Sequence, residues 1–277
     1  MKINKKAALH NLGCKVNAYE TEAMQQILEN AGYEIVPFTE YADVYVVNTC
    51  SVTNMADRKS RQMLHKAKKM NPDAIVVGAG CYVQTKEAEA LLDDTVDIVI
   101  GNNKKHELLA MLEAYENDHG KCGNVIDINH EKQEYEEMFL ERTAEHTRAF
   151  TKVQDGCNQF CSYCIIPFAR GRVRSRNSED VIREVKRLAE HGFREIVLTG
   201  IHLSSYGVDT GDNLLHLIRE VHNVDGIERI RAWKLRTENC DGWICGGTCR
   251  TAKDLSAFPS FLTERMQMPH CSAEPQI

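Results

Sequence analysis

The first 115 residues alternate short apolar runs with segments whose apolar positions recur at helical spacing. Ala23, Met24, Ile27 and Leu28 follow that helical period, and Gly32 ends the segment. Further helices are expected over Ala56–Met70, up to Leu91–Leu92 and near His106–Tyr115. The apolar runs expected to form strands are "KAALHNLGC", "YEIVPF", "DVYVVNTC", "DAIVVGAGC" and "VDIVIGN". This alternation predicts an α/β fold with a doubly wound, mostly parallel sheet.

The start of the first helix carries a local capping signal. Asn17 is a typical residue for the position before a helix, and Glu20 stands three residues later. In a capping box these two side chains satisfy the free backbone N–H groups of the first turn. We therefore expect the helix to begin at Asn17.

Three of the expected strands end in a cysteine, namely Cys14, Cys50 and Cys81. The carboxyl ends of parallel strands meet at one edge of a sheet, where ligands bind in this architecture. The sequence therefore predicts that three distant thiols come together. The alternative is that they are ordinary buried cysteines, which are common.

Residues 116–148 are rich in charge and show little periodicity. We interpret them as a linker with one short strand near Val125–Ile128. Cys122 stands alone there, and no spacing suggests a partner for it.

The second half begins with the expected strand "RAFTKVQDGC", which leads into Cys157, Cys161 and Cys164. Zinc usually takes four ligands from paired C-x2-C units. Three thiolates at C-x3-C-x2-C spacing instead favour a [4Fe–4S] cluster with one iron left open, although a zinc loop or a chance match stays possible. After this loop, the period of Val181–Leu188 predicts a helix and Glu195–Thr199 a strand.

Several motifs together resemble the radical-SAM (S-adenosylmethionine) methylthiotransferases. These are "LGCKVNAYETEAM", "VVNTCSVT", "GAGCYVQ", "GCNQFCSYCIIPFARGRVRSR" and "LTGIHLSSYG". Within that family they are most similar to the branch that modifies N6-threonylcarbamoyladenosine at position 37 of tRNA. The branches that act on isopentenyladenosine in tRNA or on a ribosomal protein are less similar. The resemblance extends over residues 1–231.

The resemblance implies two [4Fe–4S] clusters. Cys14, Cys50 and Cys81 would hold an auxiliary cluster, while the radical-SAM cluster would use the three cysteines Cys157, Cys161 and Cys164. One SAM would methylate a sulfur of the auxiliary cluster. A second would give the 5′-deoxyadenosyl radical that takes hydrogen from C2 of the adenine, and carbon–sulfur bond formation follows.

The resemblance also suggests contacts with SAM and RNA. Tyr163 would stack on the SAM adenine, or else pack structurally, and the backbone at Gly200 would lie near the SAM amino group. An extended segment would place four alternating arginines on one face for tRNA phosphates, or as a solvated edge strand. These are Arg170, Arg172, Arg174 and Arg176. The implied partners are tRNA and an electron donor.

The composition of the chain limits the partners, the cellular compartment and the cysteine chemistry that can be expected. The 277-residue chain has a net charge of −6, so nucleic-acid contacts must come from local patches. It shows no apolar run of membrane-spanning length and no signal peptide, which favours the cytoplasm. Eleven cysteines without an export signal favour metal or redox chemistry over disulfides.

After residue 231 the resemblance ends. Residues 232–277 carry Cys240, Cys245, Cys249 and Cys271, whose spacing is poor for a zinc site. Shifting the back-translated frame by one base gives a family-like sequence, which suggests an out-of-frame tail on an incomplete barrel.

The expected organisation is therefore a cluster domain at 1–118, a linker at 119–148, a partial radical-SAM (βα) barrel at 149–231 and an irregular tail at 232–277. A function from another class stays open at this point. The chain could be a non-catalytic iron–sulfur or zinc protein that binds RNA or carries electrons.

Overall fold

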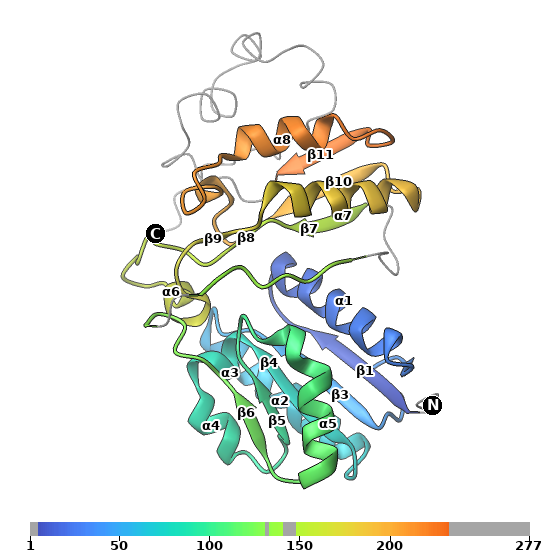
Figure 1. Ribbon diagram of the computed structural model, residues 1–277. Helices are drawn as coiled ribbons and strands as arrows, with labels where there is room; N and C mark the ends of the chain where they lie inside the picture. The colour runs from blue at the N-terminus through green and yellow to red at the C-terminus, as the bar shows by residue number, and fades with distance from the viewer. Residues whose placement is uncertain (1–4, 131–132, 141–147, 233–277) are drawn as a thin grey trace. The chain divides into compact units, whose positions relative to one another are not determined.

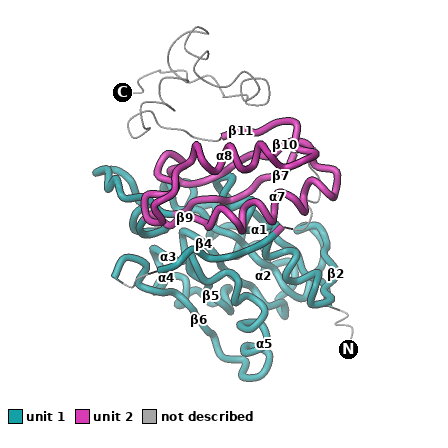
Figure 2. The backbone as a smooth tube through the Cα atoms, turned by 45° about the horizontal axis from the view of Figure 1, so that its top comes forward, with its two compact units in different colours: residues 1–139, 156–172 teal, residues 140–155, 173–277 magenta. Residues whose placement is uncertain are grey.

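The computed structural model describes residues 5–130, 133–140 and 148–232. Its contacts divide the chain into two compact units, and each is described by itself. The first takes in residues 1–139 and 156–172, and the second takes in residues 140–155 and 173–277 (Figure 2). This division interleaves along the chain, whereas the sequence alone suggested consecutive domains. Apart from Ala232, the expected tail, with its four cysteines, lies outside the described residues.

The first unit is built on a parallel sheet of six strands in the order β2-β1-β3-β4-β5-β6 (Figure 1). Adjacent strands pair in parallel throughout. This confirms the parallel α/β fold predicted from the alternation of apolar runs and helical segments. The strands are β1 (Lys6–Asn11), β2 (Glu34–Ile35), β3 (Val44–Thr49), β4 (Ile75–Gly80), β5 (Ile98–Ile100) and β6 (Cys122–Asn124).

Helices connect these strands and cover the sheet. α1 and α5 contact each other, and α2 packs on β3 and β4 (Figure 1). All six residues of β3 are buried, as expected for a parallel strand covered on both faces. The helices are α1 (Lys15–Asn30), α2 (Asn54–Met70), α3 (Cys81–Thr85), α4 (Glu87–Leu92), the 3-10 helix η1 (Lys105–Glu107), α5 (Leu108–Asp118) and α6 (Ile166–Arg170).

Some element boundaries differ from the sequence-based expectation. "YEIVPF" forms only the two-residue strand β2. α2 begins at Asn54 because the Thr53 hydroxyl accepts from the Ala56 N–H at 3.1 Å and caps the helix. The strand expected at Val125–Ile128 lies earlier, at Cys122–Asn124, where it pairs with β5 and extends the sheet.

The predicted capping box at Asn17 is wrong. The helix begins at Lys15, with Cys14 in the position before it and no side-chain cap. Asn17 and Glu20 are both buried inside the helix, at 1% and 0% exposure. Their polar groups are used in long-range contacts instead of in capping.

The second unit contains a three-stranded parallel sheet in the order β11-β10-β7 and a two-stranded antiparallel pair, β8-β9. Apolar side chains of α7 and α8 pack with this sheet around Val185, Leu198 and Leu217. The elements are β7 (Ala149–Lys152), β8 (Gln154–Asp155), β9 (Arg174–Ser175), α7 (Ser178–Glu190), β10 (Glu195–Thr199), η2 (Leu203–Ser205), α8 (Leu214–His222) and β11 (Arg229–Ala232). This is the strand–helix repeat expected of a partial barrel.

In the part of the chain that the structure describes, no helix combines the length and the apolar character needed to cross a bilayer.

Glu22 on α1 is a carboxyl whose burial raises its pKa from 4.5 to about 7. Between these values the folded chain keeps a proton that the unfolded chain has lost, so this group lowers stability as pH rises. We expect Glu22→Gln to leave stability unchanged near pH 4 and to raise it by roughly 1–3 kcal/mol at pH 8. Urea unfolding at both pH values measures this, and an equal effect at the two would contradict it.

Candidate metal centre and its supporting network

Three cysteines lie at the carboxyl edge of the six-stranded sheet. Cys14 precedes α1, Cys50 directly follows β3, and Cys81 is the first residue of α3 after β4. The pKa of the Cys50 thiol is raised first by burial and then by Cys81 and Cys14, so the three groups are close enough to interact electrostatically. The structure therefore brings together the residues that the strand-end pattern predicted would meet.

Gly13 makes the close approach of two strand ends possible. A Cβ at this position would lie 2.9 Å from both Cβ and Sγ of Cys50. Its φ of +102° is also a conformation that other residues adopt only with strain. The glycine before Cys14 thus allows the backbone to pass against the second cysteine.

Asn17 ties the first two cysteine-bearing turns together. Its Nδ2 donates to the Leu12 carbonyl at 2.7 Å and to the Thr49 carbonyl at 2.9 Å. Its Oδ1 lies 3.8 Å from the Sγ of Cys14. Because Leu12 lies two residues before Cys14 and Thr49 lies directly before Cys50, one amide side chain fixes the backbone that leads into both thiols.

A buried ion-pair network lies beside this edge. Arg170, the last residue of α6, places its two terminal nitrogens 2.9 and 3.0 Å from the two carboxylate oxygens of Glu20. Lys105 Nζ lies 2.8 Å from the same carboxylate, and all three side chains are fully buried. Arg170 also donates to Asn17. Arg170 therefore contributes to lowering the pKa of the Cys50 thiol, against the larger effect of burial.

The donor set suits an iron–sulfur cluster better than a single ion. Within the described residues, no three Cys, His, Asp or Glu side chains converge tightly enough to hold one metal ion. A [4Fe–4S] cluster is wider, because each thiolate binds a different iron atom. Soft thiolates favour such clusters, and the buried cations nearby favour an anionic group. The residues present therefore fit a cluster.

The second cysteine set lies on the loop that leads into α6, in residues that belong to the first unit. Cys157 is buried, and its N–H donates to the Gly171 carbonyl at 3.0 Å. The Cys164 N–H donates to the Cys161 carbonyl at 2.9 Å, and both of these residues are half-buried. The loop is thus closed at its base, and two of its cysteines are partly exposed.

Aromatic side chains surround this loop. Tyr163 is 84% exposed, so its ring is available to a ligand and is not part of a core. The Arg172 guanidinium stacks on the Phe160 ring at 4.2 Å from the centroid, and Phe168 meets that ring edge-on at 5.9 Å. The exposure of Tyr163, and not these contacts, is what argues against structural packing of its ring.

The expected phosphate-binding stripe of four arginines is wrong for three of its members. Arg170 ends a helix and is buried with Glu20. Arg176 pairs with Glu184 at 2.7 Å with both side chains fully buried. Arg174 is 3% exposed and lies 3.6 Å from Asp155. Only Arg172 of the four is exposed, because buried carboxylates take up the other three.

In the second unit, Gly200 directly follows β10 and is buried. A Cβ there would lie 2.8 Å from Gln154 Oε1, which accepts a hydrogen bond from the His202 N–H at 2.8 Å. Lys152 at the end of β7 and Asp155 at the end of β8, the next strand in sequence, form a buried pair at 2.7 Å. The strand ends of this unit therefore carry buried polar groups.

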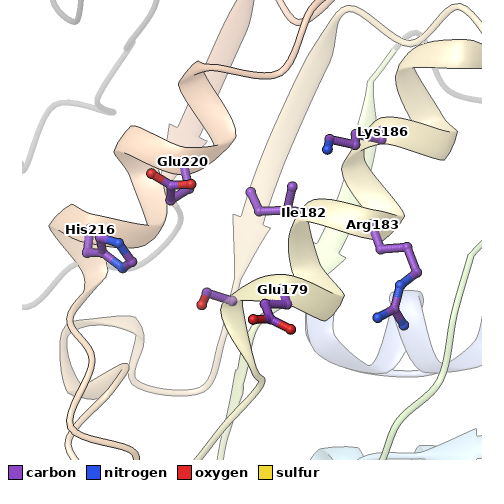
Figure 3. Close-up of a pocket in the computed structure, with 7 residues that line it drawn as sticks. Glu179, Ile182, Arg183, Lys186, His216 and Glu220 are labelled. Atoms are coloured by element: carbon purple, nitrogen blue, oxygen red, sulfur yellow. The ribbon is translucent and has the colours of Figure 1, made fainter.

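A cavity of about 500 Å³ lies between α7 and α8 of the second unit (Figure 3). Both signs of charge line it, since Glu179 and Glu220 are among its residues together with Arg183 and Lys186. None of the residues expected from the sequence to bind a cluster, SAM or RNA lines this cavity. We therefore assign it no part in the chemistry.

Comparisons with known proteins match two separate stretches of the chain. Residues 6–101 match uncharacterized protein family UPF0004, and residues 151–236 match the radical SAM superfamily. A radical SAM methyltransferase, TsrM from Kitasatospora setae, has a TM-score of 0.59 at 16% identity, covering 92% of this chain and 57% of that one. At that identity the likeness supports the fold alone, and the fold and matches define a radical-SAM protein.

Proteins similar in sequence show which group of radical-SAM proteins the chain resembles. The chain is 46% identical over 226 residues to the threonylcarbamoyladenosine tRNA methylthiotransferase MtaB of Bacillus subtilis, and 45% over 236 residues to that of Aquifex aeolicus. These matches cover 81% and 85% of this chain but 50% and 57% of the relatives. The tRNA-2-methylthio-N(6)-dimethylallyladenosine synthase of Moorella thermoacetica is 35% identical over 83% of this chain and 53% of its own.

The chain therefore belongs to the radical-SAM methylthiotransferase family. It spans about half the length of the curated relatives it matches. Sequence reasoning found the six cysteines but missed the buried partners Lys105 and Asn102. The one local signal was that "VDIVIGN" is an expected strand that ends in an amide, where three other strands end in a thiol.

Proposed function

We propose that this chain belongs to an enzyme that adds a methylthio group to C2 of N6-threonylcarbamoyladenosine at position 37 of tRNA. The observation that carries the proposal is the meeting of Cys14, Cys50 and Cys81 at one sheet edge in a chain that also has a radical-SAM cysteine loop. The threonylcarbamoyladenosine branch is favoured because two relatives with that name reach 45–46% identity.

The proposed cofactors are SAM and two [4Fe–4S] clusters. Cys14, Cys50 and Cys81 would hold the auxiliary cluster, and the loop cysteines Cys157, Cys161 and Cys164 would hold the radical-SAM cluster. When bound, the clusters supply the electron that cleaves SAM and the sulfur that is transferred. The chain itself supplies thiolates, a closed loop base and a cationic, water-poor edge around the first set.

Two residues are proposed to contact SAM. In the first unit, the exposed ring of Tyr163 offers a face for the adenine. In the second unit, the backbone at Gly200 offers polar groups for the methionine part. For RNA, Arg172 is the member of the arginine series that we retain as a phosphate contact. The proposed partners are tRNA and an electron donor, in the cytoplasm.

A second candidate substrate is isopentenyladenosine in tRNA. It is favoured by the 35% identity to the dimethylallyladenosine synthase of M. thermoacetica. A ribosomal protein as substrate and a purely structural iron–sulfur role remain the outcomes against which the test is designed.

The test has two parts. The chain is reconstituted anaerobically with iron and sulfide, reduced in the presence of SAM, and assayed for 5′-deoxyadenosine, with Cys157→Ala as the control. The same gene is expressed in cells that lack the modification, and tRNA nucleosides and ribosomal peptides are analysed by mass spectrometry. We expect 2-methylthio-N6-threonylcarbamoyladenosine. A methylthiolated isopentenyladenosine or ribosomal peptide would change the substrate that we assign. If neither 5′-deoxyadenosine nor a methylthiolated product forms, the proposed function is rejected.

A further inference from the structure

The carboxyl edge of the sheet has a fourth strand end, and it carries an amide in place of a thiol. β1, β3 and β4 lead into Cys14, Cys50 and Cys81, while β5 leads into Asn102. Asn102 is fully buried. Its Nδ2 donates to the Cys81 sulfur at 3.5 Å, within the longer range of hydrogen bonds to sulfur. A strand without cysteine therefore still contributes to the thiol cluster.

The orientation of the Asn102 amide follows from its partners. Its oxygen faces Lys105 Nζ at 2.6 Å, and an ammonium can only donate. Its nitrogen also donates to the Ala169 carbonyl at 2.7 Å, and a carbonyl can only accept. The amide therefore uses one N–H for Ala169 and the other for Cys81.

Lys105 is fully buried, and its ammonium group is the first member of a series of contacts that leads through Asn102 to Cys81. Its Nζ lies 2.6 Å from Asn102 and 2.8 Å from the Glu20 carboxylate. A cation that binds an amide oxygen draws electron density toward itself and strengthens the amide N–H as a donor. The positive charge of Lys105 therefore reaches Cys81 through one amide, in an environment of low dielectric constant.

We propose that Lys105 and Asn102 form a relay that raises the reduction potential of the cluster held by Cys14, Cys50 and Cys81. The proposal rests on the auxiliary cluster of the proposed function. Hydrogen bonds to cluster sulfurs and nearby charge are among the factors that set such potentials. Reduction adds negative charge, which the relay stabilises. Lys105 and Asn102 are positioning residues, because neither supplies a ligand.

The test isolates this cluster and measures its potential. The background is the full chain with Cys157, Cys161 and Cys164 replaced by alanine, reconstituted anaerobically and titrated with EPR detection. Lys105→Met removes the charge but leaves the Glu20–Arg170 pair intact. The matched control is Lys68→Met. Lys68 binds the Ala74 carbonyl and Asp97 at 2.9 Å each, near the amino ends of β4 and β5.

At a fixed solution potential we expect Lys105→Met to lower the ratio of reduced to oxidised cluster about tenfold, which is about 59 mV for a one-electron couple. Lys105→Arg and Lys68→Met should change the ratio less than twofold. Circular dichroism checks that each variant folds. If Lys105→Met does not fold or bind iron, Asn102→Asp replaces it, because that change removes both N–H donors and should also lower the ratio.

Two outcomes would overturn the proposal, and they are distinguishable. If the background chain binds no iron, the assignment of Cys14, Cys50 and Cys81 fails, and the relay fails with it. If iron binds but Lys105→Met behaves like Lys68→Met, the relay is rejected and the cluster assignment stands. A merely structural role for Lys105 predicts this second result, because it would change stability and leave the potential alone.

Discussion

Replacing Gly156 with alanine is expected to destroy the radical-SAM cysteine loop. A Cβ at this position would lie 1.8 Å from the Arg172 carbonyl oxygen and 2.5 Å from its carbon. Both are backbone atoms that cannot rotate away, and the φ of Gly156 is +70°. We expect a loss above about 4 kcal/mol, because both overlap and backbone strain oppose the native loop. Reconstituted chain should lose the iron bound at Cys157, Cys161 and Cys164.

Gly192→Ala is the matched control for this change. Gly192 has a φ of +88°, and a Cβ there would meet nothing within 4 Å. The control therefore carries the backbone strain without the overlap and should cost about 1–2 kcal/mol. Iron content and urea unfolding report both effects. Equal losses in the two variants would show that the contact with Arg172 does not determine the loop.

Arg170→Met is expected to cost about 3 kcal/mol of the stability of the first unit. The guanidinium is fully buried on both carboxylate oxygens of Glu20, and breaking a buried pair by removing one partner typically costs 3–5 kcal/mol. We expect the lower end of that range because Lys105 continues to neutralise Glu20.

Lys5→Met provides the exposed counterpart. Lys5 and Glu116 are 2.7 Å apart, as close as the buried pair or closer, but their side chains are 43% and 34% exposed. Water screens such a pair, so its removal should cost less than about 1 kcal/mol. Chemical unfolding of the unchanged chain, Arg170→Met and Lys5→Met measures the loss of unfolding free energy in each variant. A loss for Arg170→Met no larger than for Lys5→Met would mean that the buried network contributes little.

The sheet and the meeting of its three cysteines could be predicted because both follow from local patterns and one topological rule. Apolar runs such as Val44–Thr49 identify buried strands, and parallel strands end at one edge. The same reasoning failed for Glu20. Its spacing from Asn17 fits a capping box, but its actual partner, Arg170, lies 150 residues away. No local pattern contains that contact.

The arginine series failed for a related reason. Alternation places side chains on one face only if the segment is extended, and Arg170 instead ends the helix that begins at Ile166. Arg174 and Arg176 do lie in or beside a short strand, but Asp155 and Glu184 neutralise them. Charge in the sequence predicts exposure only where no buried carboxylate is available, and that depends on tertiary contacts.

The segment 156–172 belongs to the first unit, although it follows residues of the second unit in the sequence. It follows the first strand of the radical-SAM match, yet it is grouped with the unit that carries the six-stranded sheet. On the ribosome, the N-terminal part of a chain normally folds before the rest is made. Here Glu20 is synthesised long before its partner Arg170. The buried network of the first unit can therefore form only after the ribosome has made the first residues of the second unit. Completion of the first unit therefore requires that residues 140–155 of the second have already been synthesised.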